Sequence, residues 1–156
     1  MTANFPVSVI IADDEASIRN GLRSAVESMN LNIRVLGTAR NGLEAWNLIQ
    51  TYMPDIIITD IRMPLCDGLN LMKKCKEARF HIDFVILSGF DDFTYAQSAI
   101  RYGAKSYLLK PFKNEELKEE LKILLDEIRQ KRGLSSSSAA PSEETMTALS
   151  RKLFLN

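Results

Sequence analysis

Polar side chains follow short apolar segments at several places along the chain. Asp13 and Asp14 come after VSVIIA, Asp60 after IIIT, Ser88 after FVIL, and Lys110 after SYLL. In open parallel α/β sheets, ligands bind outside the carboxyl ends of the strands. The sequence therefore predicts three carboxylates, a hydroxyl and an ammonium at one edge of a sheet.

The three carboxylates favour a metal site. At about 4 Å and an effective dielectric constant of about 20, each pair of like charges costs about 4 kcal/mol. A bare cluster of Asp13, Asp14 and Asp60 would therefore have to take up protons or a cation. All-oxygen ligands suit Mg²⁺, and Mn²⁺ can substitute for it. The alternative, acids that only cap the helix expected at 15–29, explains one aspartate but not three.

The ammonium of Lys110 needs an anionic partner, because it lies between a buried strand and Pro111. A phosphoryl group is a suitable one: a carboxylate can accept it while the metal and the lysine neutralise the charge on its oxygens. Ser88 can donate its hydroxyl to a further oxygen. On spacing alone, separate structural roles for these residues remain an open alternative.

The elements that must position these residues alternate between strand and helix. Short continuous runs of Val, Ile and Leu are typical of strands covered on both faces, and helical periodicity fills the gaps. Connections between parallel strands are right-handed, so we expect an α/β fold: a doubly wound, five-stranded parallel sheet in three layers. The expected strands are 7–12, 33–38, 55–59, 83–87 and 106–109, and the expected helices are 15–29, 42–52, 68–79, 92–101 and 114–130.

Length and composition favour one cytoplasmic domain. The chain has 156 residues, with 20 basic and 20 acidic side chains, so no net field favours nucleic acid or an anionic membrane. No apolar stretch approaches the roughly 20 residues that span a bilayer, and no signal peptide is recognisable. We expect one domain at 5–131, followed by a flexible linker or tail at 132–156. Met146, Leu149 and Leu153 could form one face of a short terminal helix there.

Four motifs resemble a known family when they are taken together and in order. IIADDE, IITDIRMP with DGL, LSGFDDF and GAKSYLLKPF closely resemble the receiver domain of bacterial two-component response regulators, over residues 5–131. The last two motifs are most similar to receivers of AraC-like transcription regulators. The resemblance implies a flavodoxin-like (βα)5 fold. It also implies a phosphoacceptor signalling domain, which is not an enzyme beyond catalysing its own phosphorylation and dephosphorylation.

The same resemblance implies a role for each site residue. Asp60 would accept a phosphoryl group from a sensor histidine kinase. Asp13 and Asp14 would hold Mg²⁺, with help from Asp60 and the backbone carbonyl of Arg62. The phosphate ligands would be Ser88 and Lys110.

Signalling in this family requires side chains to move after phosphorylation. The resemblance implies that Tyr107 is the aromatic switch residue. Ser88 is expected to move inward and Tyr107 to rotate into the vacated space. Bonds from Lys110 and Ser88 to the phosphoryl group would supply about 3–6 kcal/mol if the inactive state lacks both. Reversing a population from 1:99 to 99:1 needs about 5.5 kcal/mol. Pro111 matches the proline that often follows a cis peptide bond.

Two bulky residues are candidates for control of the phosphate lifetime. Arg62 lies two residues after Asp60 and Phe90 two residues after Ser88, positions from which side chains can overhang the phosphoryl group. They would restrict the hydrolytic water. The alternative is that both simply point to solvent.

Several interpretations of the whole protein stay open. A phosphodonor histidine must come from another protein, because the one histidine, His81, lies just before a strand. No helix-turn-helix pair follows Lys131, so DNA would be contacted only through an output domain that this chain lacks. The favoured interpretation is an isolated receiver from a longer regulator, as the input domain of a transcription regulator; the alternative is a receiver that acts alone by binding a partner. A homodimer on phosphorylation is a further possible partner. An aspartate-based phosphohydrolase is disfavoured, because such enzymes need a second acid two residues after the nucleophile, where Arg62 follows Asp60.

Overall fold

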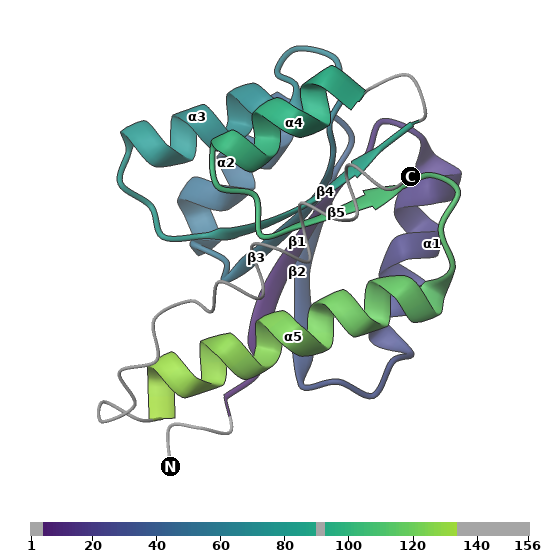
Figure 1. Cartoon of the computed structure of the whole chain (residues 1–156), viewed down its shortest axis with the longest axis vertical. Helices are drawn as coiled ribbons and strands as arrows, with labels where there is room; N and C mark the ends of the chain where they lie inside the picture. The colour runs from purple at the N-terminus through teal and green to yellow at the C-terminus, as the bar shows by residue number, and fades with distance from the viewer. Residues whose placement is uncertain (1–4, 90–92, 134–156) are drawn as a thin grey trace.

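Strands and helices alternate regularly in the computed structural model, which describes residues 5–89 and 93–133. Five strands and five helices form an open α/β domain within that part of the chain (Figure 1). The strands are β1 (Val7–Ala12), β2 (Ile33–Ala39), β3 (Ile56–Asp60), β4 (Asp83–Ser88) and β5 (Ser106–Leu109). The helices are α1 (Ala16–Glu27), α2 (Gly42–Tyr52), α3 (Gly68–Glu77), α4 (Phe93–Arg101) and α5 (Asn114–Gly133).

The strands form a single parallel sheet in the order β2-β1-β3-β4-β5. The chain thus starts near the middle of the sheet and winds outward in both directions, so the expected doubly wound fold is confirmed. β1 and β3 lie side by side, with Ala12 opposite Thr59. Their carboxyl ends consequently meet at one edge, as the positions of the aspartates predicted.

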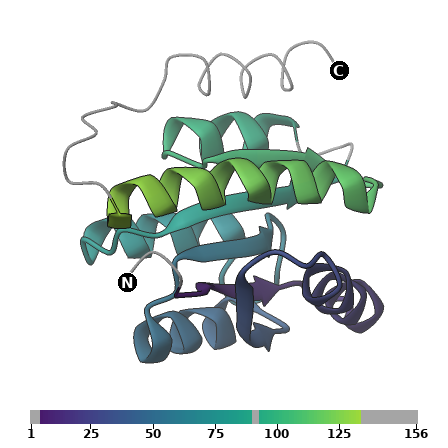
Figure 2. The ribbon, with the colours of Figure 1, turned by 90° about the horizontal axis from the view of Figure 1, so that it is seen from below.

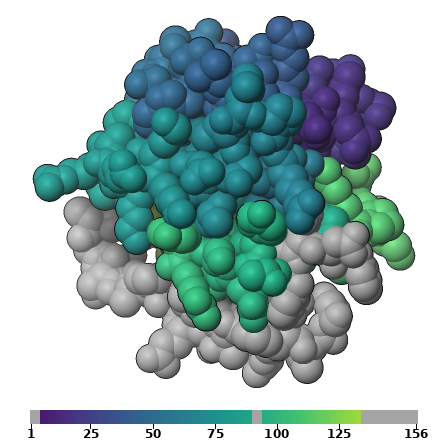
Figure 3. All heavy atoms as spheres, turned by 90° about the horizontal axis from the view of Figure 1, so that it is seen from above, coloured from purple at the N-terminus to yellow at the C-terminus, as the bar shows by residue number. Residues whose placement is uncertain are grey.

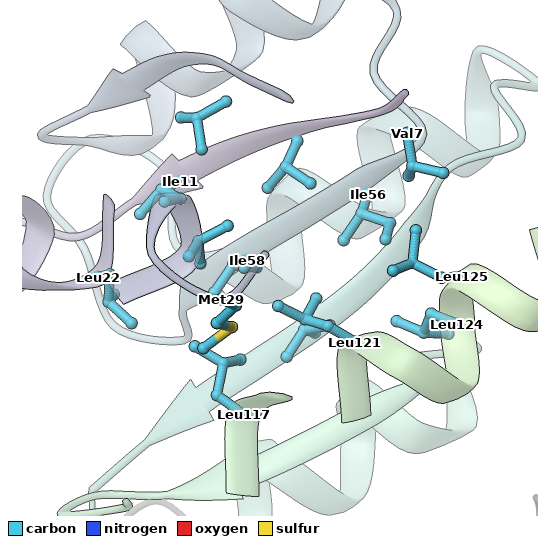
Figure 4. Close-up of a cluster of buried hydrophobic side chains, with 14 of the residues drawn as sticks. Val7, Ile11, Leu22, Met29, Ile56, Ile58, Leu117, Leu121, Leu124 and Leu125 are labelled. Carbon is cyan, nitrogen blue, oxygen red and sulfur yellow. The ribbon is translucent and has the colours of Figure 1, made fainter. Parts of the chain in front are cut away.

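One face of the sheet packs against α1 and α5. Along β3, Ile56 and Ile58 face this side and Ile57 faces the other, which is the alternation that a pleated strand imposes. A stripe of leucines on α5 lies against these strands (Figure 4), and α5 crosses this face of the sheet in Figure 2. Burial of each large side chain contributes about 1.5–3 kcal/mol. The buried members from α5 are Leu117, Leu121, Leu124, Leu125 and Ile128.

The other face is covered by α2, α3 and α4, which lie next to one another on the surface in Figure 3. Trp46 of α2 stacks on Phe80 with ring centroids 5.9 Å apart. Lys73 and Lys76 of α3 lie over the ring of Tyr102 at the end of α4. Apolar packing and cation–π contacts together join the three helices into one layer.

The structure corrects several predicted ends. Asp60 and Ser88 are the last residues of β3 and β4 rather than the first residues after them. α1 and α3 each end two residues earlier than expected. α5 runs on to Gly133, where a linker was expected, because its last turn contacts the sheet: Arg132 donates to Asp55 at 2.6 Å. The tail from 134 onward, including the helix expected through Met146, lies outside the described residues.

Candidate phosphoacceptor and metal site

The three predicted aspartates converge at the carboxyl edge of the sheet. One carboxylate oxygen from each of Asp13, Asp14 and Asp60 lies within 4.8 Å of the others. Asp13 is fully buried, Asp60 is nearly so, and Asp14 is exposed. The cluster therefore has a buried base and one side open to solvent.

A single cation lies between two of these carboxylates. Lys110 Nζ is 2.9 Å from Asp13 Oδ2 and 3.1 Å from Asp60 Oδ2. Asp13 uses its other oxygen to accept from the backbone N–H of Glu15 at 2.9 Å. Asp13 thus fixes the turn just before α1, whose N-cap is Glu15 and has no side-chain cap, and at the same time pairs with Lys110.

The sharing of one ammonium explains the pKa shifts of the site. Burial raises the pKa of Asp60 and Asp13 adds to the effect, while Lys110 opposes it. Burial alone would lower the pKa of Lys110, but its hydrogen bonds and charge interactions with Asp13 and Asp60 outweigh this and raise it. An isolated ion pair would lower the carboxyl pKa. Because this ammonium is divided between two carboxylates, it does not fully offset the burial of Asp60.

This arrangement fits a divalent ion with oxygen ligands. When ionised, the three carboxylates carry two more negative charges than Lys110 neutralises. Ligand oxygens around a six-coordinate Mg²⁺ lie about 3 Å apart when adjacent and about 4 Å when opposite, so the carboxylates need little movement. The exposed side at Asp14 leaves room for the water ligands that Mg²⁺ keeps.

The backbone around Asp60 is fixed by close packing of the following loop. Gly68, at the start of α3, lies so near that an added Cβ would be 2.7 Å from the carbonyl oxygen of Asp60. Its N–H donates to the carbonyl of Ile61 at 2.8 Å. Because only glycine fits this approach, α3 can begin directly behind the carboxylate.

The predicted hydroxyl ligand has a different partner. Ser88 Oγ donates to the hydroxyl of Tyr107 at 3.0 Å, and both side chains are buried. The family resemblance implies that Tyr107 rotates inward on activation; in this structure its ring already lies inside, with 5% of the residue exposed. The carbonyl of Ser88 accepts from the N–H of Lys110 at 2.7 Å, which holds the two strand ends together. The predicted cis peptide between Lys110 and Pro111 is confirmed.

The two lifetime candidates differ in what the structure describes. Arg62 has its backbone N–H directed to the carboxylate of Asp60, and its guanidinium lies 5.1 Å from the ring centroid of Tyr95 in α4. The side chain of Arg62 is therefore exposed but in contact with α4, and its effect on the phosphate lifetime stays a prediction. Phe90 lies outside the described residues. No sequence signal singled out Tyr95, since an isolated aromatic residue on a helix carries no pattern.

The thiols near the site have no reactive features. Cys66 and Cys75 are both free thiols. Burial raises the pKa of Cys66, and it raises the pKa of Cys75 to about 12. Both therefore remain protonated at neutral pH.

Within the described ranges, no helix has both the length and the hydropathy needed to cross a membrane.

Comparison with known proteins agrees with this geometry. The profile of the response regulator receiver domain family matches residues 9–122. The chain is 39% identical over 121 residues to the transcriptional regulatory protein YesN of Bacillus subtilis, covering 78% of this chain and 33% of the relative. It is 34% identical over 141 residues to the transcriptional regulatory protein HptR of Staphylococcus aureus, covering 90% and 55%.

A solved structure shows the same fold. The REC domain of AraT, a response regulator from Geobacillus stearothermophilus, is 36% identical and superposes with a TM-score of 0.74, covering 80% of this chain and 97% of that domain. The match thus covers nearly the full length of that receiver domain. The chain spans only about a third to a half of the two curated relatives described above.

Proposed function

Since the chain belongs to the response regulator receiver domain family, we propose that it is a signalling switch that accepts a phosphoryl group on Asp60. The observation that carries the proposal is the pairing of Lys110 Nζ with both Asp13 and Asp60 at the carboxyl edge of the sheet. This pairing places a nucleophilic carboxylate next to a cation that can bind the incoming group.

The transfer needs few protein groups. A carboxylate oxygen of Asp60 attacks the phosphorus, and the new O–P bond forms as the bond to the donor atom breaks and its electron pair leaves with the donor. Lys110, held by Asp13, then donates to a phosphoryl oxygen. Because phosphoryl transfer depends mostly on positioning and electrostatics, these contacts are sufficient protein chemistry for self-catalysed phosphorylation.

Asp13, Asp14, Asp60 and the backbone carbonyl of Arg62 are the proposed ligands of Mg²⁺, for which Mn²⁺ could substitute. When bound, the ion would neutralise part of the charge on the phosphoryl oxygens. The carboxylate cluster supports the first three ligands. The carbonyl of Arg62 is proposed from the family resemblance.

Mg²⁺ is expected to stabilise the fold and to be required for phosphorylation. An ion that binds only the folded state at one hundred times its Kd adds about 2.7 kcal/mol to the free energy of unfolding. Thermal unfolding with increasing MgCl₂ should show a rising midpoint, and acetyl phosphate should label the protein only when the ion is present. Asp13→Asn should reduce the shift, whereas Asp126→Asn, on the exposed side of α5, should not. An equal shift in all three proteins would contradict the ligand assignment.

The energy available for switching is smaller than the sequence suggested. Lys110 is already bonded to two carboxylates, and the Ser88 hydroxyl to Tyr107. Replacing a neutral hydrogen bond by a charge-assisted one gains about 0.5–2 kcal/mol rather than the full value. A complete reversal of populations, which needs about 5.5 kcal/mol, therefore requires further groups to move.

The proposed partners follow from the family and the relatives. A sensor histidine kinase would be the phosphodonor. DNA would be reached through an output domain like those implied by the names of the transcriptional regulatory relatives. We place the protein in the cytoplasm, where such a kinase and DNA are both accessible.

A homodimer is the partner that is simplest to test. Beryllofluoride stands in for the phosphoryl group on Asp60. Gel filtration of the chain with beryllofluoride and Mg²⁺ is expected to show an earlier elution volume than without them, because a surface altered by activation would then pair with a second copy. Asp60→Asn is the matched control, since it cannot hold the beryllofluoride. Identical elution of the wild type under both conditions would contradict phosphorylation-dependent dimerisation.

A phosphohydrolase is the competing class. Position 62 carries Arg rather than the second acid that such enzymes use, and the guanidinium lies over Tyr95. We therefore expect no steady-state release of phosphate from small phosphoesters.

A further inference from the structure

An exposed contact joins the two segments that leave the sheet beside Asp60. Arg62 belongs to the loop between β3 and α3, and Tyr95 to the first turn of α4. The Cζ atom of Arg62 lies 5.1 Å from the centroid of the Tyr95 ring, within the range of a cation–π contact. The exposed fraction of Tyr95 is 39%, so water weakens this contact.

The side chain of Arg62 starts next to the phosphoacceptor. Its backbone N–H is hydrogen-bonded to the carboxylate of Asp60 and lowers the pKa of that group, so the side chain begins beside the carboxylate. In this structure the direction of the side chain is toward Tyr95.

A phosphoryl group would compete with the ring for the guanidinium. Cation–π contacts at exposed sites are weak, whereas an arginine fork binding two phosphate oxygens makes a pair of charge-assisted hydrogen bonds. The guanidinium should therefore leave the ring when Asp60 carries a phosphoryl group. Over the phosphoryl group it would also obstruct the water that hydrolyses the acyl phosphate.

We infer that Tyr95 is a positioning residue that competes with the phosphoryl group for the guanidinium of Arg62, and that it thereby limits the lifetime of the acyl phosphate. This inference rests on the proposed function of Asp60. It also gives α4 a direct response to phosphorylation, because its first turn loses the contact with the loop after β3.

The test compares the rate of dephosphorylation in variants of both residues. The protein is labelled with acetyl phosphate and Mg²⁺, the small donor is removed, and the remaining phosphoprotein is followed with time. Tyr95→Leu removes the ring that competes for Arg62, so the acyl phosphate should last about two- to fivefold longer, the factor that an exposed cation–π contact represents. Tyr95→Phe keeps a ring and should match the wild type.

Two controls separate positioning from a general effect on α4. Tyr102 is as exposed as Tyr95 and also carries lysines over its ring, but these come from α3, so Tyr102→Leu should leave the lifetime unchanged. In an Arg62→Gln background, Tyr95→Leu should have no further effect, because no guanidinium remains to be released.

The outcomes are distinct from a failure of the proposed function. An unchanged or shorter lifetime in Tyr95→Leu, or the same lengthening in the Arg62→Gln background, would overturn the role of Tyr95 while Asp60 stays the phosphoacceptor. Absence of labelling in the wild type would instead refute the proposed function.

Discussion

Asp60→Asn is expected to abolish phosphorylation by acetyl phosphate. The amide has nearly the shape of the carboxylate but cannot form the acyl phosphate, because it lacks a nucleophilic oxygen. Incubation with acetyl phosphate and Mg²⁺, followed by intact mass measurement, checks the result. Asp126→Asn is the matched control and should be labelled as the wild type is.

The loss in Asp60→Asn should not come from unfolding. Burial raises the pKa of Asp60, which means that the folded state accommodates its charge less well than water does. A neutral amide removes this cost and the repulsion from Asp13. The urea midpoint, followed by the fluorescence of Trp46, should therefore be unchanged or higher than in the wild type. Labelling of the variant at the wild-type level would refute the assignment.

Lys110→Met is expected to destabilise the fold at neutral pH and to prevent the response to phosphorylation. It removes the cation that Asp13 and Asp60 share, and leaves two carboxylates facing each other. Breaking a fully buried pair costs about 3–5 kcal/mol, and we expect about 2–3 here because the site is partly open to water. Urea unfolding at pH 7 without Mg²⁺ checks the value.

The deficit of Lys110→Met should shrink as the pH falls. The raised pKa of Asp60 means that the folded state holds this proton more tightly than the unfolded state. The resulting stabilisation is complete below the ordinary pKa of 3.8 and is lost as the pH rises through the folded value. Without Lys110, which lowers the Asp60 pKa, that window extends to higher pH, so protonation relieves the variant more than the wild type.

A matched control is available in the same loop. Lys113 is exposed, and the contacts described for it involve only its backbone. Lys113→Met should therefore change the free energy of unfolding by less than about 0.5 kcal/mol at pH 7 and at pH 5. A deficit in Lys110→Met that stays constant between pH 7 and pH 5 would show that the lysine does not act through Asp60.

The fold and most of the cluster were predictable because they depend on local patterns. Continuous apolar runs fixed the strands, and the parallel order brought Asp13 and Asp60 to neighbouring strand ends. The ends of elements were less predictable, since they depend on tertiary contacts. α5 continues past Lys131 because Arg132 pairs with Asp55, a residue 77 positions away.

The partners of the polar side chains were the least predictable part of the site. Lys110 was expected to bind a phosphoryl group, and in this structure it pairs with Asp13. This pairing was hard to predict because β5 and β1 are separated by two other strands. The inward position of Tyr107 and its bond to Ser88 depend on side-chain rotamers, which no spacing in the sequence encodes. The same holds for the placement of Arg62 over Tyr95.

The most direct test of the central claim is chemical trapping of the phosphorylated residue. Borohydride reduces an acyl phosphate to the corresponding alcohol, so an aspartyl phosphate becomes homoserine. After labelling with acetyl phosphate and Mg²⁺, reduction and peptide sequencing by mass spectrometry should find homoserine at position 60. Homoserine at position 13 or 14, or a stable phosphate on Ser88, would contradict the assignment of Asp60 as the phosphoacceptor.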